Sequence, residues 1–260
     1  MTKIAFIGMG NMAQALCSGF AKSGKIKAGD MFAFAPNQEK LAANARRFGF
    51  TACKSLKDAV SAADTVVMAC KPYQIEGVLS EIKDDLKNKV LISIALGWNF
   101  AKYQAVLDKS TRVQFVMPNT PAMVGEGVFL FEKSNSLKAD ERSEIMELFA
   151  ALGVVEELSD NLMGIGGAVT GCGPAFVDLF LEAYADAAVK YGIPRSTAYK
   201  LVSQTVLGSA KLQLETGEHP AVLKDNVCSP SGSTIRGVTA LEEHGLRNAC
   251  IKSIDSIMNK

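Results

Sequence analysis

The sequence predicts a doubly wound α/β sheet at the N-terminus and an all-α domain after it. The first half alternates short apolar runs with amphipathic segments, which is typical of a parallel sheet flanked by helices. A glycine-containing turn, Gly8–Ala13, follows the first apolar run directly and opens a helix. After about Ser159 the strand-like runs stop and long helical periodicities replace them. We therefore divide the chain into domains 1–158 and 159–260.

The predicted elements of the first domain alternate in type along the chain. The predicted strands are Ile4–Ile7, Met31–Phe34, Thr65–Ala69, Val90–Ile94, Arg112–Val116, Gly127–Phe131 and Val154–Glu157. The predicted helices are Met12–Ser23, Gln38–Phe48, Tyr73–Ile82 and Ala139–Ala151.

The second domain contains three strong helical patterns. Pro174 opens one helix, which ends before Gly192. Another covers about Thr197 to Glu215, and a last one carries Ile251, Ile254 and Ile257. About a hundred residues make a marginal core, so we expect this domain to form a homodimer; a higher assembly of dimers stays open.

Composition excludes several functional classes. The 260 residues are 48% hydrophobic and carry 28 basic and 27 acidic side chains, for a net charge of +1. Nucleic-acid and polybasic membrane surfaces need clustered positive charge, so neither kind of partner is expected. Six scattered cysteines without a C-x-x-C pair predict no metal site and no disulfides, and they favour the reducing cytoplasm.

Two segments bear on targeting. The chain enters a strand at Ile4, so we expect no signal peptide. The window from Leu162 to Leu181 is long and apolar enough to resemble a membrane span. Gly171–Pro174 interrupts it and Asp178 adds a charge, which favours a buried helix start in a soluble protein.

The turn after the first strand predicts a dinucleotide site. Gly8-Met9-Gly10-Asn11-Met12-Ala13 has the G-x-G-x-x-A form of the Rossmann fingerprint. Gly8 permits the tight turn, Gly10 admits a pyrophosphate, and Ala13 keeps the helix close to the strand. The expected cofactor contacts here run from Ile7 to Met12, including Met9 and Asn11.

The end of the second strand indicates which dinucleotide binds. Ala35 stands where an NAD enzyme usually has an acidic residue, while Asn37 and Lys40 can meet a 2′-phosphate without repulsion. We therefore predict NADPH as the cofactor, with NADH as the alternative. Asn37 could equally serve only as a helix cap, and Lys40 only as a solvated charge.

The other strand ends supply further cofactor candidates, because open α/β sheets bind ligands at the carboxyl ends of their strands. Ala69, Cys70, Lys71 and Pro72 follow one strand, and Ala95 and Asn119 follow the next two. Asn119 is flanked by two prolines and is the polar candidate for orienting the nicotinamide.

A second anion site is predicted in the segment from Lys224 to Ile235. Its serines, threonine and Gly232 lead straight into a helix, and a helix start presents backbone N–H groups to an anion. An ordinary helix cap after a turn is the competing interpretation.

The whole chain resembles the pyrroline-5-carboxylate reductase family. The matching motifs are Phe6–Met12, Lys71-Pro72, Met117–Pro121, Gly171–Phe176 and the stretch from His219-Pro220 to Glu242. The resemblance implies NAD(P)H-dependent reduction of a cyclic imine to L-proline, the last step of proline biosynthesis, by a dimer interlocked through its helical domains.

The resemblance also implies substrate residues. Thr234 matches a threonine that faces the substrate, and Ser233 and Thr234 supply N–H groups to its carboxylate. Asn226 and Asp160 match polar positions near the substrate. Ser231 stands beside Gly232 where the family often has a second glycine, and Thr170 and Phe176 replace a serine and a tyrosine.

Two other functions remain to be weighed. A 3-hydroxyacid or 6-phosphogluconate-type dehydrogenase needs a catalytic lysine on the helix between the domains, but the helix from Pro174 has none before Lys190. A non-catalytic NADP sensor is less consistent with an anion loop that retains Ser233 and Thr234.

Overall fold

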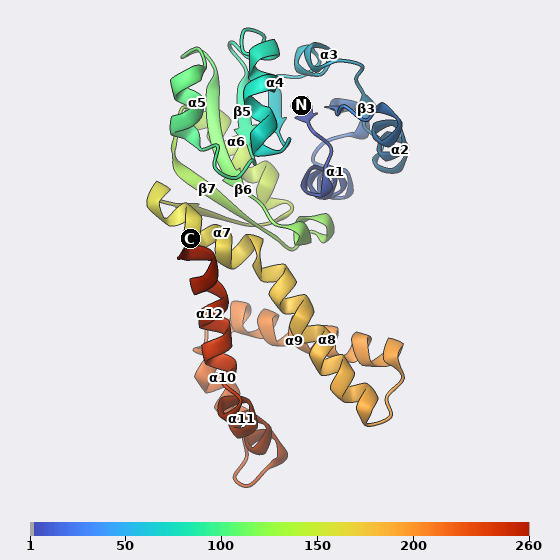
Figure 1. Ribbon diagram of the computed structural model, residues 1–260, viewed down its shortest axis with the longest axis vertical. Coiled ribbons are helices and arrows are strands. Elements are labelled where there is room, and N and C mark those ends of the chain that lie inside the picture. Colours follow the sequence, from blue (N-terminus) through green and yellow to red (C-terminus); the bar gives the residue numbers. More distant parts are fainter. Residues whose placement is uncertain (1–2, 260) are drawn as a thin grey trace. The chain divides into compact units, whose positions relative to one another are not determined.

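The computed structural model describes residues 3–259 of the chain, which divides into two compact units. The N-terminal unit is Met1–Gly171 and the C-terminal unit is Cys172–Lys260. The N-terminal unit holds the sheet, and the C-terminal unit is built from helices (Figure 1).

The sheet of the N-terminal unit has eight strands in the order β3-β2-β1-β4-β5-β6-β7-β8. The strands are β1 (Ile4–Ile7), β2 (Met31–Phe34), β3 (Thr51–Ala52), β4 (Thr65–Met68), β5 (Val90–Ser93), β6 (Arg112–Met117), β7 (Gly127–Asn135) and β8 (Gly153–Leu158). The pairing is parallel except between β6 and β7, where the direction reverses. The order reverses at β1, since β2 pairs on one side of it and β4 on the other.

Helices cover both faces of this sheet (Figure 1). Those of the N-terminal unit are α1 (Asn11–Ser23), α2 (Gln38–Phe48), α3 (Leu56–Ser61), α4 (Ile75–Ile82), α5 (Phe100–Val106), α6 (Ala139–Ala150) and α7 (Met163–Gly171). Short 3-10 turns occur at Ala28–Asp30, Pro72–Gln74, Thr120–Val124 and Asp160–Leu162. One buried cluster joins the sheet to α1, α2 and α6, and a second joins it to α3, α4 and α5. The predicted doubly wound architecture is confirmed.

Most predicted elements of this unit lie within two residues of the observed ones, and β1, β2 and α2 agree at both ends. The sequence analysis did not identify β3, α3 or α5, which are two, six and seven residues long. Such short segments do not complete a hydrophobic period, so pattern alone does not reveal them. Strand β7 continues beyond the predicted end at Phe131 to Asn135.

An aromatic cluster fills the core under α1 and α6. The Phe149 ring lies 5.6 Å from that of Phe20, 5.1 Å from that of Phe129 and 5.6 Å from that of Phe131, all in edge-on geometry. All four side chains are fully buried. Edge-to-face contacts of this kind add to the free energy gained by burial.

Helix α1 approaches the segment Thr120–Val124 closely through Gly19. A Cβ at Gly19 would lie 2.7 Å from the Ala122 carbonyl oxygen and 2.7 Å from Leu152 Cδ2. Only a glycine permits this approach. The helix that opens at the glycine-containing turn therefore also supports the segment that follows Asn119.

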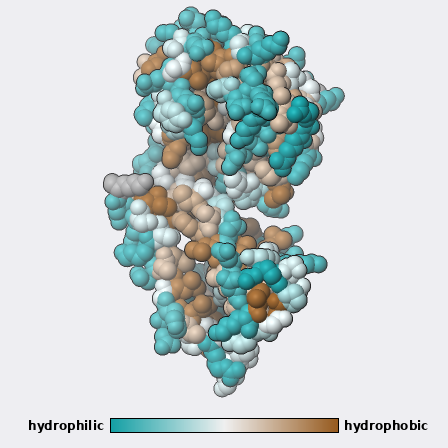
Figure 2. Space-filling model, turned by 45° about the vertical axis from the view of Figure 1, so that its right-hand side comes forward, coloured by the Kyte–Doolittle hydropathy of each residue, from teal (hydrophilic) through white to brown (hydrophobic). Residues whose placement is uncertain are grey.

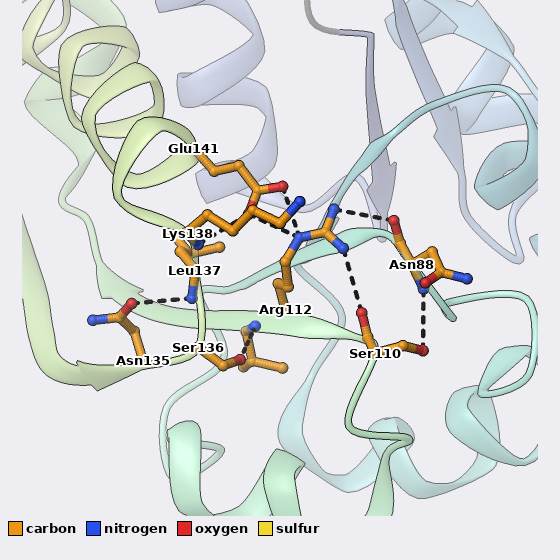
Figure 3. A network of polar contacts seen from close by, with 9 residues as sticks. Asn88, Ser110, Arg112, Asn135, Ser136, Leu137, Lys138 and Glu141 are labelled. Carbon is orange, nitrogen blue, oxygen red and sulfur yellow. Dashed lines mark hydrogen bonds and ion pairs between the residues drawn. The ribbon is translucent and has the colours of Figure 1, made fainter.

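A polar network lies at the end of the sheet where β5 and β6 begin (Figure 3). Arg112 Nε lies 2.7 Å from Glu141 Oε1 on α6, and Arg112 Nη2 donates to the Asn88 carbonyl at 3.0 Å. Glu141 also accepts a hydrogen bond from Lys138 N, and Ser136 Oγ accepts one from Val113 N. The Arg112 guanidinium therefore links β6 to α6 and to the backbone just before β5.

Helix α7 belongs to the N-terminal unit. Met163 packs in a small buried cluster with Phe115 and Leu130. A Cβ at Gly167 would lie 2.0 Å from Met117 Sδ, so the helix lies directly against β6. The compact unit therefore ends at Gly171, later than the predicted domain boundary after residue 158.

The C-terminal unit consists of five helices in the described residues. They are α8 (Gly173–Lys190), α9 (Arg195–Thr216), α10 (Pro220–Asn226), α11 (Ser233–Glu243) and α12 (Leu246–Met258). The three predicted helices are confirmed as α8, α9 and α12, and α11 begins where the anion loop predicted a helix start.

The C-terminal unit exposes much apolar surface (Figure 2). Leu179 on α8, Leu214 on α9 and Ile251 on α12 are each more than 60% exposed. The stretch Asp160–Lys190 has the length and composition of a membrane span, and 11% of its most apolar window is buried. The expectation that this segment is a buried helix start is therefore wrong for the single chain. Its α8 part belongs to the apolar surface of the helical unit.

Replacement of Phe149 tests the importance of the aromatic cluster. Phe149→Ala leaves a cavity among three rings, so the free energy of unfolding should fall by about 3–5 kcal/mol. Urea denaturation followed by the fluorescence of Trp98, the only tryptophan, measures the change. Val106 on α5 is 52% exposed and provides the control: Val106→Ala should cost far less, and equal losses would contradict this account.

Candidate functional site

A cavity of about 330 Å³ lies where β1, β2 and β4 end. It brings together residues from three separate predicted segments. The predicted cofactor residues that line it are Ile7, Gly8, Met9, Gly10, Asn37, Lys40, Ala69, Cys70 and Lys71. This is the carboxyl edge of a parallel sheet at the point where strand order reverses, the usual ligand position in such folds.

The two glycines of the turn have different steric environments. Gly8 has φ +99°, and a Cβ there would lie 2.7 Å from Cys70 N and 2.8 Å from the Ala69 carbonyl carbon. Gly10 caps α1, and a Cβ there would meet nothing within 4 Å. Gly8 therefore lets two strand ends meet, while Gly10 leaves open space at the start of a helix. A pyrophosphate fits that space because the helix start offers unpaired N–H groups.

Asn37 and Lys40 lie on the β2 side of the same cavity. Asn37 is the N-cap of α2, and its Oδ1 accepts a hydrogen bond from Lys40 N at 2.9 Å. The capping interpretation of Asn37 is thus confirmed. The cap uses only the oxygen, which leaves the amide nitrogen of Asn37 and the Lys40 ammonium facing solvent beside the cavity.

Other predicted cofactor residues do not line this cavity. Asn11 and Met12 form the first turn of α1, Pro72 opens a 3-10 turn, and Ala95 is buried beyond the end of β5. Asn119 is also buried. Its Oδ1 accepts from Val128 N at 2.8 Å, and its Nδ2 donates to the Thr170 carbonyl at 3.1 Å. The structure thus uses the Asn119 side chain to tie β6, β7 and α7 together, and its contact with a nicotinamide stays a prediction.

The sequence analysis did not identify some of the cavity's lining residues. Leu56, Gln74 and Val78 contribute to the wall. Leu56 lies on the unpredicted helix α3, and Val78 is on the apolar face of α4. Gln74 Oε1 accepts from Lys71 N at 3.1 Å and so fixes the loop after β4. A Gln three residues after the loop lysine is the one sequence signal that indicates this contact.

Among residues 3–259, Cys70 contributes the only thiol to the wall of the cavity. Burial raises the pKa of Cys70 to about 11. The neutral thiol is therefore the form present at neutral pH, and it forms part of the wall rather than a nucleophile.

The predicted anion loop forms a tight turn in the C-terminal unit. Gly232 N donates to the Ser229 carbonyl at 3.0 Å, which closes a turn over Pro230 and Ser231. Ser231 has φ +59°, in the left-handed region that favours glycine. A Cβ at Gly232 would lie 2.4 Å from Ser229 Oγ and 3.0 Å from the Ser229 carbonyl oxygen, so any larger residue here requires Ser229 to shift.

The start of α11 has no side-chain cap. Gly232 is the N-cap, and no side chain accepts from the first turn of the helix. The exposed N–H groups of Ser233 and Thr234 are therefore available to an anion. The helix also presents Thr234, Val238 and Leu241 to a groove of about 430 Å³ that Tyr184 of α8 completes.

Two other candidate residues, Asn226 and Asp160, precede this loop in the sequence. Asn226 is the exposed last residue of α10. Asp160 belongs to the N-terminal unit, where its Oδ1 accepts from Ser134 N at 3.2 Å. Asp160 thus holds the backbone of β7 at Ser134. Its contact with substrate stays a prediction.

The backbone of Ser231 provides a stability test of the loop. Ser231→Gly removes a left-handed non-glycine residue, at the cost of a more flexible unfolded chain. The free energy of unfolding should rise by about 0.5–1 kcal/mol. Ser231→Ala is the control, because it deletes the hydroxyl but keeps the strained φ. Urea denaturation that shows no gain for the glycine variant would contradict the strain.

Family models match both units. A model described as pyrroline-5-carboxylate reductase dimerisation matches residues 160–260, and one described as NADP oxidoreductase, coenzyme F420-dependent, matches residues 3–97. The first begins close to the predicted domain boundary. It includes α7, which packs in the N-terminal unit.

Relatives of known name match the chain over its whole length. The pyrroline-5-carboxylate reductase of Treponema pallidum is 39% identical over 98% of this chain and 98% of its own. That of Escherichia coli is 39% identical over 99% and 96%. The crystal structure of Plasmodium falciparum pyrroline carboxylate reductase with NADP bound has a TM-score of 0.89 at 32% identity, over 98% of this chain and 95% of that one. The chain belongs to the pyrroline-5-carboxylate reductase family.

Proposed function

We propose that this chain reduces 1-pyrroline-5-carboxylate to L-proline with a nicotinamide dinucleotide as hydride donor, as the last step of proline biosynthesis. The full-length match to reductases of that name carries the proposal. The carboxyl-edge cavity and the uncapped start of α11 support it with one site for each of two anionic ligands.

The residues around the carboxyl-edge cavity suit a dinucleotide. Gly8 and Gly10 give the pyrophosphate access to the start of α1, and the open space at Gly10 fits its volume. Asn37 and Lys40 would hold the phosphate on the adenosine ribose, since none of the described residues that line the cavity is acidic. NADPH is therefore the proposed cofactor, and NADH the alternative. When bound, it supplies the hydride for the imine carbon.

The start of α11 suits the substrate carboxylate. The Ser233 and Thr234 N–H groups would bind the carboxylate, with Ser231, Gly232 and Asn226 around it. The imine needs only a proton on nitrogen to accept a hydride on carbon, so the protein has to orient the ring and exclude water. We assign to the Thr234 hydroxyl a hydrogen bond to the ring nitrogen, which makes Thr234 the catalytic residue.

The C-terminal unit suits self-association. The family model that matches this part of the chain is described as a dimerisation domain. The helices of the unit expose large apolar side chains that a second subunit would cover. We therefore propose a homodimer in the cytoplasm, with 1–158 binding the cofactor and 159–260 providing dimerisation and substrate contacts. No nucleic acid or membrane partner is part of this proposal.

The Thr234 hydroxyl gives the sharpest test of the chemistry. The wild type should oxidise NADPH when pyrroline-5-carboxylate is added, as followed by loss of NADPH absorbance. Thr234→Val keeps the shape of the side chain but removes the hydrogen bond, so kcat/KM should fall by about tenfold or more. Thr234→Ser keeps the hydroxyl and should retain most of the activity.

The outcomes of this series separate two claims. No NADPH oxidation by the wild type would contradict the proposed reaction. Full turnover by Thr234→Val would leave the reaction intact and contradict the role of the hydroxyl.

Substitutions at the β2 end of the cavity test the preference for NADPH over NADH. Asn37→Asp keeps an oxygen to cap α2 but places a negative charge beside the 2′-phosphate. Its KM for NADPH should rise by about tenfold, while its KM for NADH stays within about twofold. Lys40→Ala should shift the preference in the same direction by removing a positive charge. Exposed Lys57 on α3 provides the matched control, since Lys57→Ala should change neither value; equal changes for both cofactors would contradict the assignment.

A further inference from the structure

A short exposed turn, residues 94–99, follows β5 at the same edge of the sheet as the cavity. Trp98 N donates to the Ala95 carbonyl at 3.1 Å, and Gly97 has φ +80°. Leu96 at the tip is 69% exposed. Ile94 N donates to the Met68 carbonyl, directly before the Ala69–Lys71 wall of the cavity. The turn is thus the next feature along the edge after β4.

Three buried polar side chains support this turn from below. They come from different elements: Ser93 ends β5, Tyr103 lies on α5, and Glu132 lies on β7. Ser93 Oγ donates to the Trp98 carbonyl at 3.1 Å, and the Tyr103 hydroxyl lies 3.3 Å from Ser93 Oγ. Phe100 N, directly after the turn, donates to Glu132 Oε2 at 2.9 Å.

All three side chains are at most 1% exposed. Burying hydroxyls and a carboxyl group costs free energy unless each is hydrogen-bonded. Apolar residues of similar volume often stabilise a core at least as much as a buried polar group does. Ser93 bonds the turn itself and Glu132 bonds the first residue of α5, while the Tyr103 hydroxyl contacts Ser93 and so supports the turn through it. The cluster therefore fixes the geometry of the turn more than it adds stability.

The size of the cavity indicates what the turn faces. About 330 Å³ is at the small end for a ligand pocket and holds only part of a dinucleotide. Asn37 and Lys40 take the adenosine end at β2, and Gly10 takes the pyrophosphate at β1. The remaining half would continue past β4 to β5, where the turn lies.

We propose that Ser93, Tyr103 and Glu132 are positioning residues that hold the 94–99 turn rigid as the wall for the nicotinamide half of the cofactor. This inference rests on the proposed function. The three side chains act through the backbone of the turn and do not touch the cofactor themselves.

Two ligands distinguish this role from a general structural one. NADPH occupies both halves of the proposed site, whereas adenosine 2′,5′-bisphosphate occupies only the β2 and β1 part. Trp98 lies in the turn, with its ring 5.1 Å from that of Tyr103, so its fluorescence reports the turn directly. Equilibrium titration of each ligand, with kcat and KM from NADPH oxidation, gives the readouts.

Tyr103→Phe and Glu132→Ala each remove one part of the support. Each should weaken NADPH binding or lower kcat by about tenfold, as expected for the loss of one buried hydrogen bond from the support of the turn. Affinity for adenosine 2′,5′-bisphosphate should stay within about twofold of wild type. Glu132→Gln keeps an acceptor for Phe100 N and should restore most of the loss.

Several outcomes would overturn the inference. NADPH binding and turnover equal to wild type in the folded Tyr103→Phe protein would do so, even if Glu132→Ala does not fold. A parallel loss of both ligands would assign the cluster a general structural role. A wild type that binds the bisphosphate but does not oxidise NADPH with pyrroline-5-carboxylate would instead contradict the proposed function.

Discussion

The close approach of two backbone segments at Gly8 is the constraint on which the cofactor site depends. The amide of Cys70 would lie 2.7 Å from any Cβ at this position, and φ there is +99°. Because the turn after β1 lies directly against the loop after β4, the start of α1 opens into a cavity between the two. The parallel pairing of β1 with β2 and β4 then brings Asn37 and Lys40 to the same edge. One glycine therefore determines where the proposed dinucleotide site opens.

The second proposed anion site depends on the same property of a helix start, in a separate unit. At α1 and at α11 a glycine is the N-cap and no side chain satisfies the first turn of the helix. A helix start with a glycine N-cap is less stable than one capped by Ser, Asn or Asp by only a few tenths of a kcal/mol, roughly. By contrast, α2, α3 and α5 carry side-chain caps from Asn37, Ser55 and Asn99. Helices α8, α9 and α12 also begin without a side-chain cap, so a missing cap does not by itself mark an anion site. The proposed reaction assigns two of the uncapped starts, those of α1 and α11, to its anionic ligands.

Sequence patterns were sufficient for the long elements and for part of the site. The fingerprint Gly8–Ala13 and the strand ends at Asn37 and Cys70 could be predicted because strand ends in a parallel sheet converge by topology. The role of Asn119 could not, since its partners Val128 and Thr170 are brought to it only by tertiary folding. The same holds for Glu132, whose contact with Phe100 joins β7 to a helix that the sequence pattern did not reveal. Ser231 was noted as a departure from glycine, but only its positive φ shows the physical cost of that departure.

Helix α1 has one constrained position at Gly10 and another at Gly19, and the two together limit which insertions and deletions the helix can accept. Its N-cap Gly10 lines the cavity, and Gly19 fits against the Ala122 carbonyl. Each residue of an α-helix rotates by about 100° relative to the last. A single insertion or deletion between Gly10 and Gly19 would therefore turn one contact away from its partner while the other stayed in place. The exposed side of the segment tolerates substitutions. Its length is fixed, because it sets the spacing between the Gly8–Ala13 turn and the segment after Asn119.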